Sequence, residues 1–334
     1  MQVWEIREFG LDKLVLTERP EPQPGPRQVL VKLRAASLNY RDLMVVQGTY
    51  NRNLRLPLVP LSDGVGEVVA VGAEVTRVRV GERVAGIFMQ SWLEGAIDEH
   101  KAKTALGSNL DGVLAEYVVL HEDGVVHVPE HLSDTEAATL PCAAVTAWHA
   151  LLDSGSLKAS DTVLLQGTGG VSLFALEFAK LTGARIIMTS SSDEKLERAK
   201  TLGVTDGINY RATPEWARRV RELTDGVGVD HVVEVGGAGT LGQSLQTVRM
   251  GGTVSVIGAL AGAGEVNPVP ILMRSVRVQG IYVGSRAMFE AMNRAFALHR
   301  MTPIVDRIFP FVEVKEALSY MQSGSHFGKI AIRF

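Results

Sequence analysis

Three glycines directly after an apolar run are the residues of this chain whose spacing points most clearly to chemistry. The run Thr162–Gln166 favours a strand, Gly167 and Gly169 follow, and an alanine- and leucine-rich segment begins at once. In such a turn the first glycine bends the chain, the second lets a pyrophosphate approach the backbone, and the new helix points its N–H groups at the phosphates. Gly170 and Val171 open that helix. The pattern predicts a dinucleotide-binding turn.

A glycine turn alone is weak support, because an ordinary strand-to-helix turn can have the same composition. Here the pattern recurs along the chain. An apolar segment at Arg185–Thr189 follows at the distance of a βαβ unit, and two further strand-like segments end in glycine at Gly236 and Gly258. Such repetition predicts an α/β domain with one doubly wound parallel sheet. Gly236 and Gly258 are expected to close their strands under the nucleotide.

The end of the second strand predicts which nucleotide is bound. NAD-binding sheets usually carry Asp or Glu there for the ribose 2′-hydroxyl, whereas NADP-binding sheets offer cations or hydroxyls. Here Ser190 and Ser191 occupy the position, Asp193 falls inside the next helical turn, and Lys195 follows. We therefore expect NADPH, held by Ser190, Ser191 and Lys195. In the alternative interpretation the serines cap the helix and Lys195 lies on its solvated face.

Length and composition favour a cytoplasmic protein of two domains with a small-molecule substrate. The chain has 334 residues, is 46% hydrophobic and carries a formal charge of −3. This charge does not favour nucleic acid or an anionic membrane as a partner, and we expect neither. No apolar run reaches the length of a membrane span, and no export signal is visible at the N-terminus. A single cysteine, Cys142, allows no intrachain disulfide.

The two predicted domains differ in pattern. Residues 1–128 alternate short apolar runs with glycine and proline, which predicts an all-β barrel or sandwich. Residues 129–285 alternate strands and helices, as a nucleotide-binding domain does. A last strand at 328–334 has no βαβ partner, so residues 286–334 are expected to complete the first domain. The polar segment 90–111 predicts a loop or lid.

Together these features resemble the medium-chain dehydrogenase/reductase superfamily, and especially its zinc-independent, quinone-oxidoreductase-like members. The resemblance covers nearly the whole chain and rests on the glycine turn, Gly64–Gly72, Leu140–Leu151 and Gly328–Lys329. It implies a discontinuous GroES-like catalytic domain, a Rossmann domain, and an active site in the cleft between them. It also implies a homodimer that continues the Rossmann sheet through an edge strand at Val276–Val283.

The resemblance adds further coenzyme contacts. Thr146 matches a threonine that lies against the nicotinamide, and Tyr210 matches a phosphate-contacting tyrosine of quinone reductases. Val283 and Ser285 are expected near the nicotinamide amide, and Lys329 is expected to reach the coenzyme. The alternatives are a helix residue bonded to its own backbone for Thr146 and a surface lysine for Lys329.

Two of the three positions that match catalytic zinc ligands carry poor donors. The resemblance aligns the ligands of the family's alcohol dehydrogenases with Asn39, Ser62 and Cys142. Zinc needs three deprotonated N, S or O ligands, which an amide and a hydroxyl do not supply. The four-cysteine structural site is absent as well, since the chain has one cysteine. We therefore expect no metal. The alternative is a regrouped site made of Asp42, Asp63, His100 and Cys142.

Without a Lewis acid, hydride transfer to an already electrophilic acceptor is easier than oxidation of an alcohol. Asn39 is a candidate to hydrogen-bond the acceptor oxygen, and Tyr50 matches a proton-donating tyrosine of enoyl-reductase relatives. Asn39–Asp42 also resembles the Asn-(Phe/Tyr)-Arg-Asp pattern of enoyl-thioester reductase modules, which makes Asp42 a third candidate. Alternatively, Tyr50 is a loop aromatic at the domain edge. The alternative for Asp42 and Asp63 is that their carboxylates cap turns or pair with Arg41 or Arg55.

The predicted function is a zinc-independent, NADPH-dependent oxidoreductase. Its small-molecule acceptor is a quinone or an activated alkene, meaning an enone or enoyl compound. Two other functions remain open at this stage. One is a zinc-type alcohol dehydrogenase or aldehyde reductase, and the other is a non-catalytic NADPH-binding protein.

Overall fold

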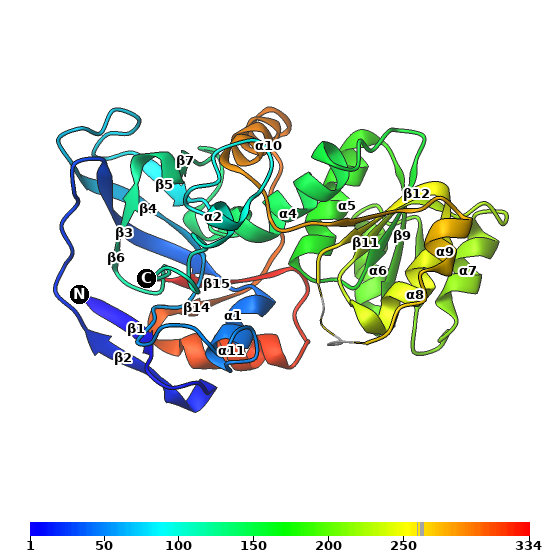
Figure 1. The fold of residues 1–334 in the computed structure, drawn as a ribbon, viewed down its shortest axis with the longest axis horizontal. Coiled ribbons are helices and arrows are strands. Elements are labelled where there is room, and N and C mark those ends of the chain that lie inside the picture. The colour runs from blue at the N-terminus through cyan, green and yellow to red at the C-terminus, as the bar shows by residue number, and fades with distance from the viewer. Residues whose placement is uncertain (259, 261–263) are drawn as a thin grey trace. The chain divides into compact units, whose positions relative to one another are not determined.

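The computed structural model describes every residue except 259 and 261–263, and it divides into two compact units (Figure 1). Unit 1 comprises Met1–Val145 and Gly284–Phe334, and unit 2 comprises Thr146–Val283. The first division comes later than residue 128, because helix α3 (Asp134–Ala137) packs against strands of unit 1. Unit 1 is discontinuous, as the unpaired final strand predicts.

Unit 1 is built on a mainly antiparallel sheet whose strand order is β14-β15-β3-β4-β5-β7, with β6 also paired to β3. Its strands are β3 (Gln28–Ser37), β4 (Asp63–Val71), β5 (Arg83–Gly86), β6 (Tyr117–His121), β7 (Val125–His127), β14 (Val305–Pro310) and β15 (Lys329–Arg333). A ribbon of β1 (Gln2–Ile6) and β2 (Leu14–Glu18) pairs separately. In β3, Val31 and Leu33 are buried while Lys32 and Arg34 are exposed, which is the alternation of a half-buried strand.

The last strand joins the two ends of the chain inside unit 1. Strand β15 pairs antiparallel with β3, with Ala331 opposite Ser37, and β3 in turn places Ser37 opposite Asp63 of β4. In Figure 1, β15 (red) lies next to β3 (blue). This register brings the start of β15, the end of β3 and the start of β4 to one edge of the sheet.

The helices of unit 1 flank these strands. They are α1 (Tyr40–Val46), α2 (Glu99–Ala102), α3, α10 (Arg286–His299) and α11 (Val314–Gln322), with 3-10 turns at Leu11–Lys13, Glu122–Gly124 and Phe311–Glu313. The segment predicted as a loop or lid is anchored at two points. Trp92 and Leu106 are buried, and the carbonyl of Trp92 accepts the N–H of Arg286 at 2.9 Å.

Unit 2 contains a parallel sheet of strand order β10-β9-β8-β11-β12-β13. The strands are β8 (Thr162–Gln166), β9 (Arg185–Ser190), β10 (Asp206–Asn209), β11 (Val229–Glu234), β12 (Val248–Val256) and β13 (Arg277–Gly280). The helices are α5 (Gly170–Thr182), α6 (Asp193–Thr201), α7 (Trp216–Leu223), α8 (Ala238–Thr247) and α9 (Val269–Met273). Val163, Leu164 and Leu165 of β8 are fully buried, as expected for a central parallel strand covered on both faces.

The strand order reverses between β8 and β11. From β8 the chain adds β9 and β10 on one side, and then β11, β12 and β13 on the other. Ligands of open parallel sheets bind outside the carboxyl ends of the strands at such a switch point. The glycine turn after β8 therefore lies at the position where this architecture binds nucleotides.

An irregular helical stretch precedes β8. Helix α4 (Val145–Trp148) is flanked by π-helical segments at Leu140–Ala144 and His149–Asp153. π-Helical segments are rare in proteins, and those that do occur are often found at functional sites. Cys142 and Thr146 both belong to this stretch. Throughout the described part of the chain, no helix combines the length and the hydrophobicity of a membrane span.

Candidate functional site

A cluster of polar and charged side chains is buried in unit 1 where β3 ends and β4 and β15 begin. We call it the polar cluster, and its members are Asn39, Asp42, Asp63 and Lys329. Both carboxylates are fully buried, and Lys329 is 3% exposed. Charged groups are rarely buried unless they are paired or hydrogen-bonded, so the contacts of each member matter.

Lys329 is held by hydrogen bonds at the first residue of β15. Its Nζ donates to the carbonyl of Leu38 and to Oδ1 of Asn39, each at 2.6 Å. The same nitrogen lies 3.9 Å from Oδ2 of Asp63. The alternative that Lys329 is a surface lysine is therefore wrong.

Asp63 faces Lys329 and anchors the neighbouring segment. Its carboxylate accepts the Ser62 hydroxyl at 2.7 Å and the backbone N–H of Cys142 at 3.2 Å. Burial raises the pKa of Asp63, and the charge of Lys329 and these hydrogen bonds act in the opposite direction. Asp63 thus ties β4 to the π-helical segment that contains Cys142.

Asp42 makes the contacts expected of a carboxylate that caps a turn and pairs with an arginine. Its carboxylate accepts the backbone N–H of Asn39 at 2.8 Å and pairs with Arg41 at 3.2 Å. The first contact closes a capping box at the start of α1. Burial raises the pKa of Asp42 to about 6, although the Arg41 charge opposes the shift. Asp42 therefore positions Asn39 and Arg41.

Tyr50 is linked to the polar cluster through Arg41. The Arg41 guanidinium carbon lies 5.1 Å from the centre of the Tyr50 ring and 5.0 Å from that of Phe88. Arg41 also donates to the carbonyl of Leu106 at 3.0 Å. Tyr50 itself is 36% exposed, so its ring is open to solvent on one side. The structure thus places this loop aromatic next to the candidate site.

Asn39 presents its amide in a particular way. It is 9% exposed and caps α1, and its Oδ1 accepts from Lys329. Its Nδ2 has no hydrogen-bond partner among the described residues. Nδ2 is near enough to Asp63 to help lower that carboxyl's pKa, but no bond of good geometry joins the two groups. The polar cluster therefore contains a buried N–H donor with unused bonding capacity.

In unit 2 the glycine turn leaves open space above the backbone. Gly167 has a φ of +71°, in the left-handed region that glycine adopts readily. A Cβ added to Gly167 or Gly169 would meet no heavy atom within 4 Å. No side chain caps α5, which begins with Gly170 and Val171. Ser172 fixes this helix to β8, since its hydroxyl donates to the Gln166 carbonyl at 2.6 Å.

The residues predicted to contact a 2′-phosphate lie at or directly after the ends of β9 and β10 and in the first turn of α6. Tyr210 donates its backbone N–H to the carbonyl of Ser190 at 3.0 Å. Ser192 caps α6 by accepting the N–H of Lys195, so the helix cap is not Ser190 or Ser191. The Ser190 hydroxyl is buried and accepts the N–H of Ser192 at 3.3 Å.

Gly236 and Gly258 have a packing role. A Cβ on Gly236 would lie 2.3 Å from Oγ1 of Thr240, and one on Gly258 would lie 2.3 Å from the carbonyl oxygen of Val235. Neither distance is compatible with a side chain at these positions. Both glycines allow the loops after β11 and β12 to pack closely, whatever they contact besides.

A buried network that was not predicted from the sequence lies beside these glycines. Glu234, at the end of β11, is fully buried and accepts the N–H groups of Gly236 and Gly237 at 2.8 and 3.0 Å. It also accepts Nε2 of Gln166 at 2.8 Å. A single glutamate ending an apolar strand is the only sequence signal of this network. It joins the carboxyl ends of β8 and β11, where the strand order reverses.

The remaining predicted contacts flank the two points of the sequence where the chain passes from one unit to the other. Val283 has a φ of +56°, which is strained for a β-branched residue, and its carbonyl accepts Nδ1 of His149 at 2.7 Å. Strain of this kind is often retained at functional positions. Ser285 caps α10 by accepting the N–H of Met288 at 3.3 Å, and Thr146 is buried in α4.

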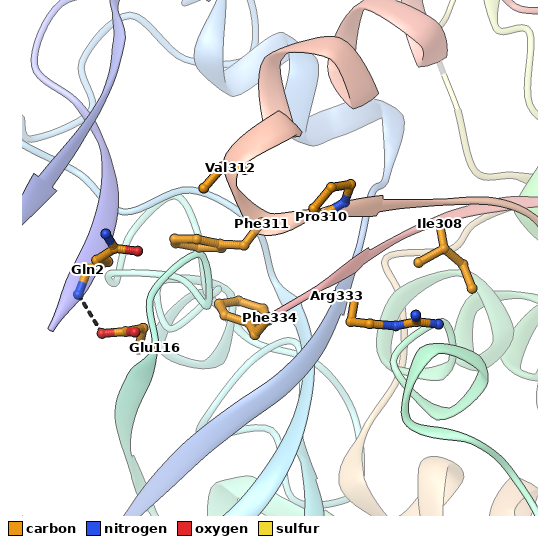
Figure 2. A pocket seen from close by; sticks show the side chains of 8 residues that line it. All are labelled: Gln2, Glu116, Ile308, Pro310, Phe311, Val312, Arg333 and Phe334. Atoms are coloured by element: carbon orange, nitrogen blue, oxygen red, sulfur yellow. Dashed lines mark hydrogen bonds between the residues drawn. The ribbon is translucent and has the colours of Figure 1, made fainter.

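A separate hollow lies at the other end of β15. It has a volume of about 480 Å³, and Figure 2 shows its lining residues, Gln2, Glu116, Ile308, Pro310, Phe311, Val312, Arg333 and Phe334. The backbone N–H of Gln2 donates to Glu116 at 2.6 Å at its rim. No member of the polar cluster lines it, so it is distinct from the candidate site.

Comparison with known proteins decides the family. The alcohol dehydrogenase GroES-like domain family matches residues 25–130, and the zinc-binding dehydrogenase family matches residues 170–297. A zinc-type alcohol dehydrogenase-like protein of Schizosaccharomyces pombe is 45% identical over 97% of this chain and 96% of its own length. The chain belongs to the medium-chain dehydrogenase/reductase superfamily. As a member, it is an oxidoreductase of a family that binds a nicotinamide coenzyme.

Solved structures of the superfamily extend the likeness to the whole fold. An NAD-dependent alcohol dehydrogenase is 32% identical, with a TM-score of 0.91 and complete coverage of both chains. The 2-octenoyl-CoA carboxylase reductase CinF, in complex with NADP and 2-octenoyl-CoA, is 28% identical, with a TM-score of 0.84 and coverage of 97% and 82%. These two relatives differ in both coenzyme and substrate.

The residues of this member do not fit the zinc site of the superfamily. The three matching positions offer the Asn39 amide, the Ser62 hydroxyl, which donates to Asp63, and the Cys142 thiol. Burial, and then the Asp63 charge, raise the pKa of Cys142, which opposes the thiolate that zinc requires. The buried Lys329 ammonium bonded to Asn39 adds a positive charge at the same place. We derive no step through zinc.

The four residues of the alternative, regrouped metal site are not gathered at one place. His100 is exposed on α2, whereas Asp42 and Asp63 are fully buried at the polar cluster. Within the described ranges, no three His, Cys, Asp or Glu side chains gather as metal ligands. A nicotinamide coenzyme does fit unit 2, because the turn at Gly167 and Gly169 is open and α5 begins without a side-chain cap.

Proposed function

We propose that this protein is a zinc-independent reductase that uses NADPH to reduce a quinone or an alkene conjugated to a carbonyl. The observation that carries the proposal is the buried Asn39 amide. Its Nδ2 is a donor without a partner among the described residues, and it occupies a position that matches a zinc ligand in the family's alcohol dehydrogenases. An N–H donor stabilises negative charge on an acceptor oxygen, but it does not activate an alcohol as a metal does.

The chemistry is divided between the coenzyme and this chain. When bound, the reduced nicotinamide supplies a hydride, which carries two electrons. An enone accepts the hydride at its β-carbon, and the π-electron pair moves to the carbonyl oxygen to give an enolate. Asn39 Nδ2 donates a hydrogen bond to that oxygen, and Tyr50 delivers the proton that the α-carbon then takes up. A quinone takes the hydride and the proton to become a hydroquinone.

The residue types at the ends of β9 and β10 support NADPH over NADH as the coenzyme. Ser190 is the last residue of β9, Ser191 follows it, Tyr210 follows β10 and donates its backbone N–H to Ser190, and Lys195 lies in the first turn of α6. Asp193, the nearest carboxylate in sequence, lies in the first turn of α6 and accepts from Asn209 at 2.9 Å. It is thus engaged at the helix start, whereas NAD-binding sheets place an acid at the strand end. CinF, which binds NADP with an enoyl thioester, is a precedent within the superfamily.

The assembly and location belong to the proposal as well. Strand β13 is at the edge of the parallel sheet, and Val278 and Tyr282 in and beside it are 37% and 39% exposed. We propose a homodimer formed along this edge. We also propose a cytoplasmic location, because a chain with one cysteine forms no intrachain disulfide and does not depend on an oxidising compartment. Sedimentation of the wild type and a Val278→Lys variant tests it, since a dimer formed elsewhere would be insensitive to the substitution.

An acceptor panel tests the proposed activity. NADPH absorbance is followed with quinones, enones, enoyl thioesters, aldehydes and alcohols (the last with NADP⁺), with and without a chelator. We expect turnover with a quinone, enone or enoyl thioester that the chelator does not change, and a lower dissociation constant for NADPH than for NADH. Turnover confined to alcohols or aldehydes and lost with the chelator would overturn the proposal. Coenzyme binding without turnover on the whole panel would indicate a non-catalytic protein.

A further inference from the structure

Lys329 determines which way the Asn39 amide faces. A lysine ammonium has three N–H donors and no acceptor. Because Nζ lies 2.6 Å from the Asn39 side chain, the atom that faces it must be the carbonyl oxygen Oδ1. The second bond of Nζ, to the Leu38 carbonyl at 2.6 Å, holds the ammonium in place. Turning the amide over would set two donors against each other, so this orientation is fixed.

The fixed orientation leaves the Asn39 Nδ2 donor without a partner. Asn39 is 9% exposed, and Nδ2 lies near the Asp63 carboxylate but makes no hydrogen bond of good geometry to it or to any other described residue. A buried donor left without a partner destabilises the fold. The fold retains this cost although its other groups at the polar cluster are bonded, as the Asp42 and Asp63 carboxylates are. Such a donor is suited to an oxygen that is present only when a substrate is bound.

We infer that Lys329 is a positioning residue of the reductase, which turns the Asn39 amide so that Nδ2 faces the acceptor oxygen. This inference rests on the proposed function and adds a role that differs from the coenzyme contact expected for Lys329. Lys329 acts through Asn39, and its positive charge lies one amide group away from the developing oxyanion. A preorganised donor of this kind needs no rearrangement as the negative charge forms.

A double-mutant cycle tests the inference. Lys329→Met and Asn39→Ala are made singly and together, and kcat and KM are measured for NADPH-dependent reduction of an enone that the wild type accepts. Asn39→Ala should lower kcat roughly 100-fold or more, as loss of an oxyanion donor does. Lys329→Met, which leaves the donor present but no longer oriented, should lower kcat by about 10- to 100-fold. The double variant should be no slower than Asn39→Ala alone, because Lys329 has nothing left to orient. The dissociation constant of NADPH should stay within about two-fold.

Conservative variants separate orientation from folding. Lys329→Arg keeps the charge and the donors and should restore part of kcat. Lys329→Met leaves Asp63 without its buried cation, and the loss of one partner of a buried ion pair is strongly destabilising. Where that variant does not fold, the same cycle is run in an Asp63→Asn background, which removes both charges of the pair.

Each outcome has one meaning. Multiplicative effects of Lys329→Met and Asn39→Ala on kcat, or a weaker binding of NADPH by Lys329→Met alone, would overturn the positioning role. The second result would make Lys329 a coenzyme contact instead. Failure of the proposed function looks different, because the wild type would then reduce no quinone, enone or enoyl thioester with NADPH.

Discussion

Replacing Gly169 with alanine tests whether the open turn after β8 binds the coenzyme phosphates. An added Cβ meets no heavy atom within 4 Å, and the φ of −80° suits any residue. The free energy of unfolding should therefore change by less than about 1 kcal/mol. The methyl group would occupy the space into which the pyrophosphate approaches the backbone. We expect the dissociation constant of NADPH to rise at least 10-fold, which is about 1.4 kcal/mol.

Gly236→Ala is the matched substitution at a glycine that packs internally. Its Cβ would lie 2.3 Å from Oγ1 of Thr240, and that hydroxyl is held at 2.5 Å by the buried Glu234 carboxylate. Overpacking costs about 1–3 kcal/mol. A hydrogen bond to a charged group contributes about 1.5–3 kcal/mol. We expect this variant to lose about 2–4 kcal/mol of unfolding free energy, by these two effects.

Urea denaturation followed by circular dichroism measures the stability of both variants, and calorimetric titration measures NADPH binding. The prediction is a fold-neutral, binding-deficient Gly169→Ala and a destabilised Gly236→Ala. Wild-type affinity in folded Gly169→Ala would refute the assignment of the turn. A loss of stability in Gly169→Ala equal to that of Gly236→Ala would refute the geometric argument.

Three further predictions concern single side chains. The N–H groups of Thr76 and Arg77, with the Arg27 guanidinium, hold the pKa of Glu122 at about 2. The charged Glu122 carboxylate therefore stabilises the fold fully above pH 4.5, and this stabilisation is lost as the pH falls towards 2. In urea titrations Glu122→Gln should lower the free energy of unfolding by up to about 3 kcal/mol at neutral pH, and it should make that free energy depend less on pH in acid. Burial raises the pKa of Asp42 from 3.8 to about 6, so its charge destabilises the fold as pH rises through that interval. Between pH 3.8 and about 6, the unfolding free energy of Asp42→Asn measured in urea should therefore rise relative to that of the wild type by up to about 3 kcal/mol. A difference between the two proteins that stays constant with pH would contradict this. Lys195→Ala should raise the dissociation constant of NADPH by roughly 10-fold in calorimetric titration and leave that of NADH unchanged, whereas equal losses would indicate general destabilisation.

Local patterns predicted the parallel sheet and its glycine turn. Strand β8 is apolar throughout because both of its faces are buried, and the turn glycines follow it directly in the sequence. These features depend on neighbours along the chain, and so they can be recognised without a structure.

The polar cluster depends on register between distant strands. Lys329 and Asn39 are 290 residues apart, and they meet because β15 pairs with β3 next to β4. No periodicity signals that contact, so Lys329 was open to interpretation as a surface residue. The Glu234 network was missed for the same reason, since its partner Gln166 lies 68 residues away on β8.

The destination of the hydride in metal-analysed protein tests the central claim most directly. NADPH that carries deuterium at C4 is incubated with an enone and protein whose metal content is measured on the same sample. The account predicts deuterium at the β-carbon of the saturated product, at a rate independent of the residual metal. Deuterium found only at the carbinol carbon, with a rate that rises in proportion to bound zinc, would contradict it.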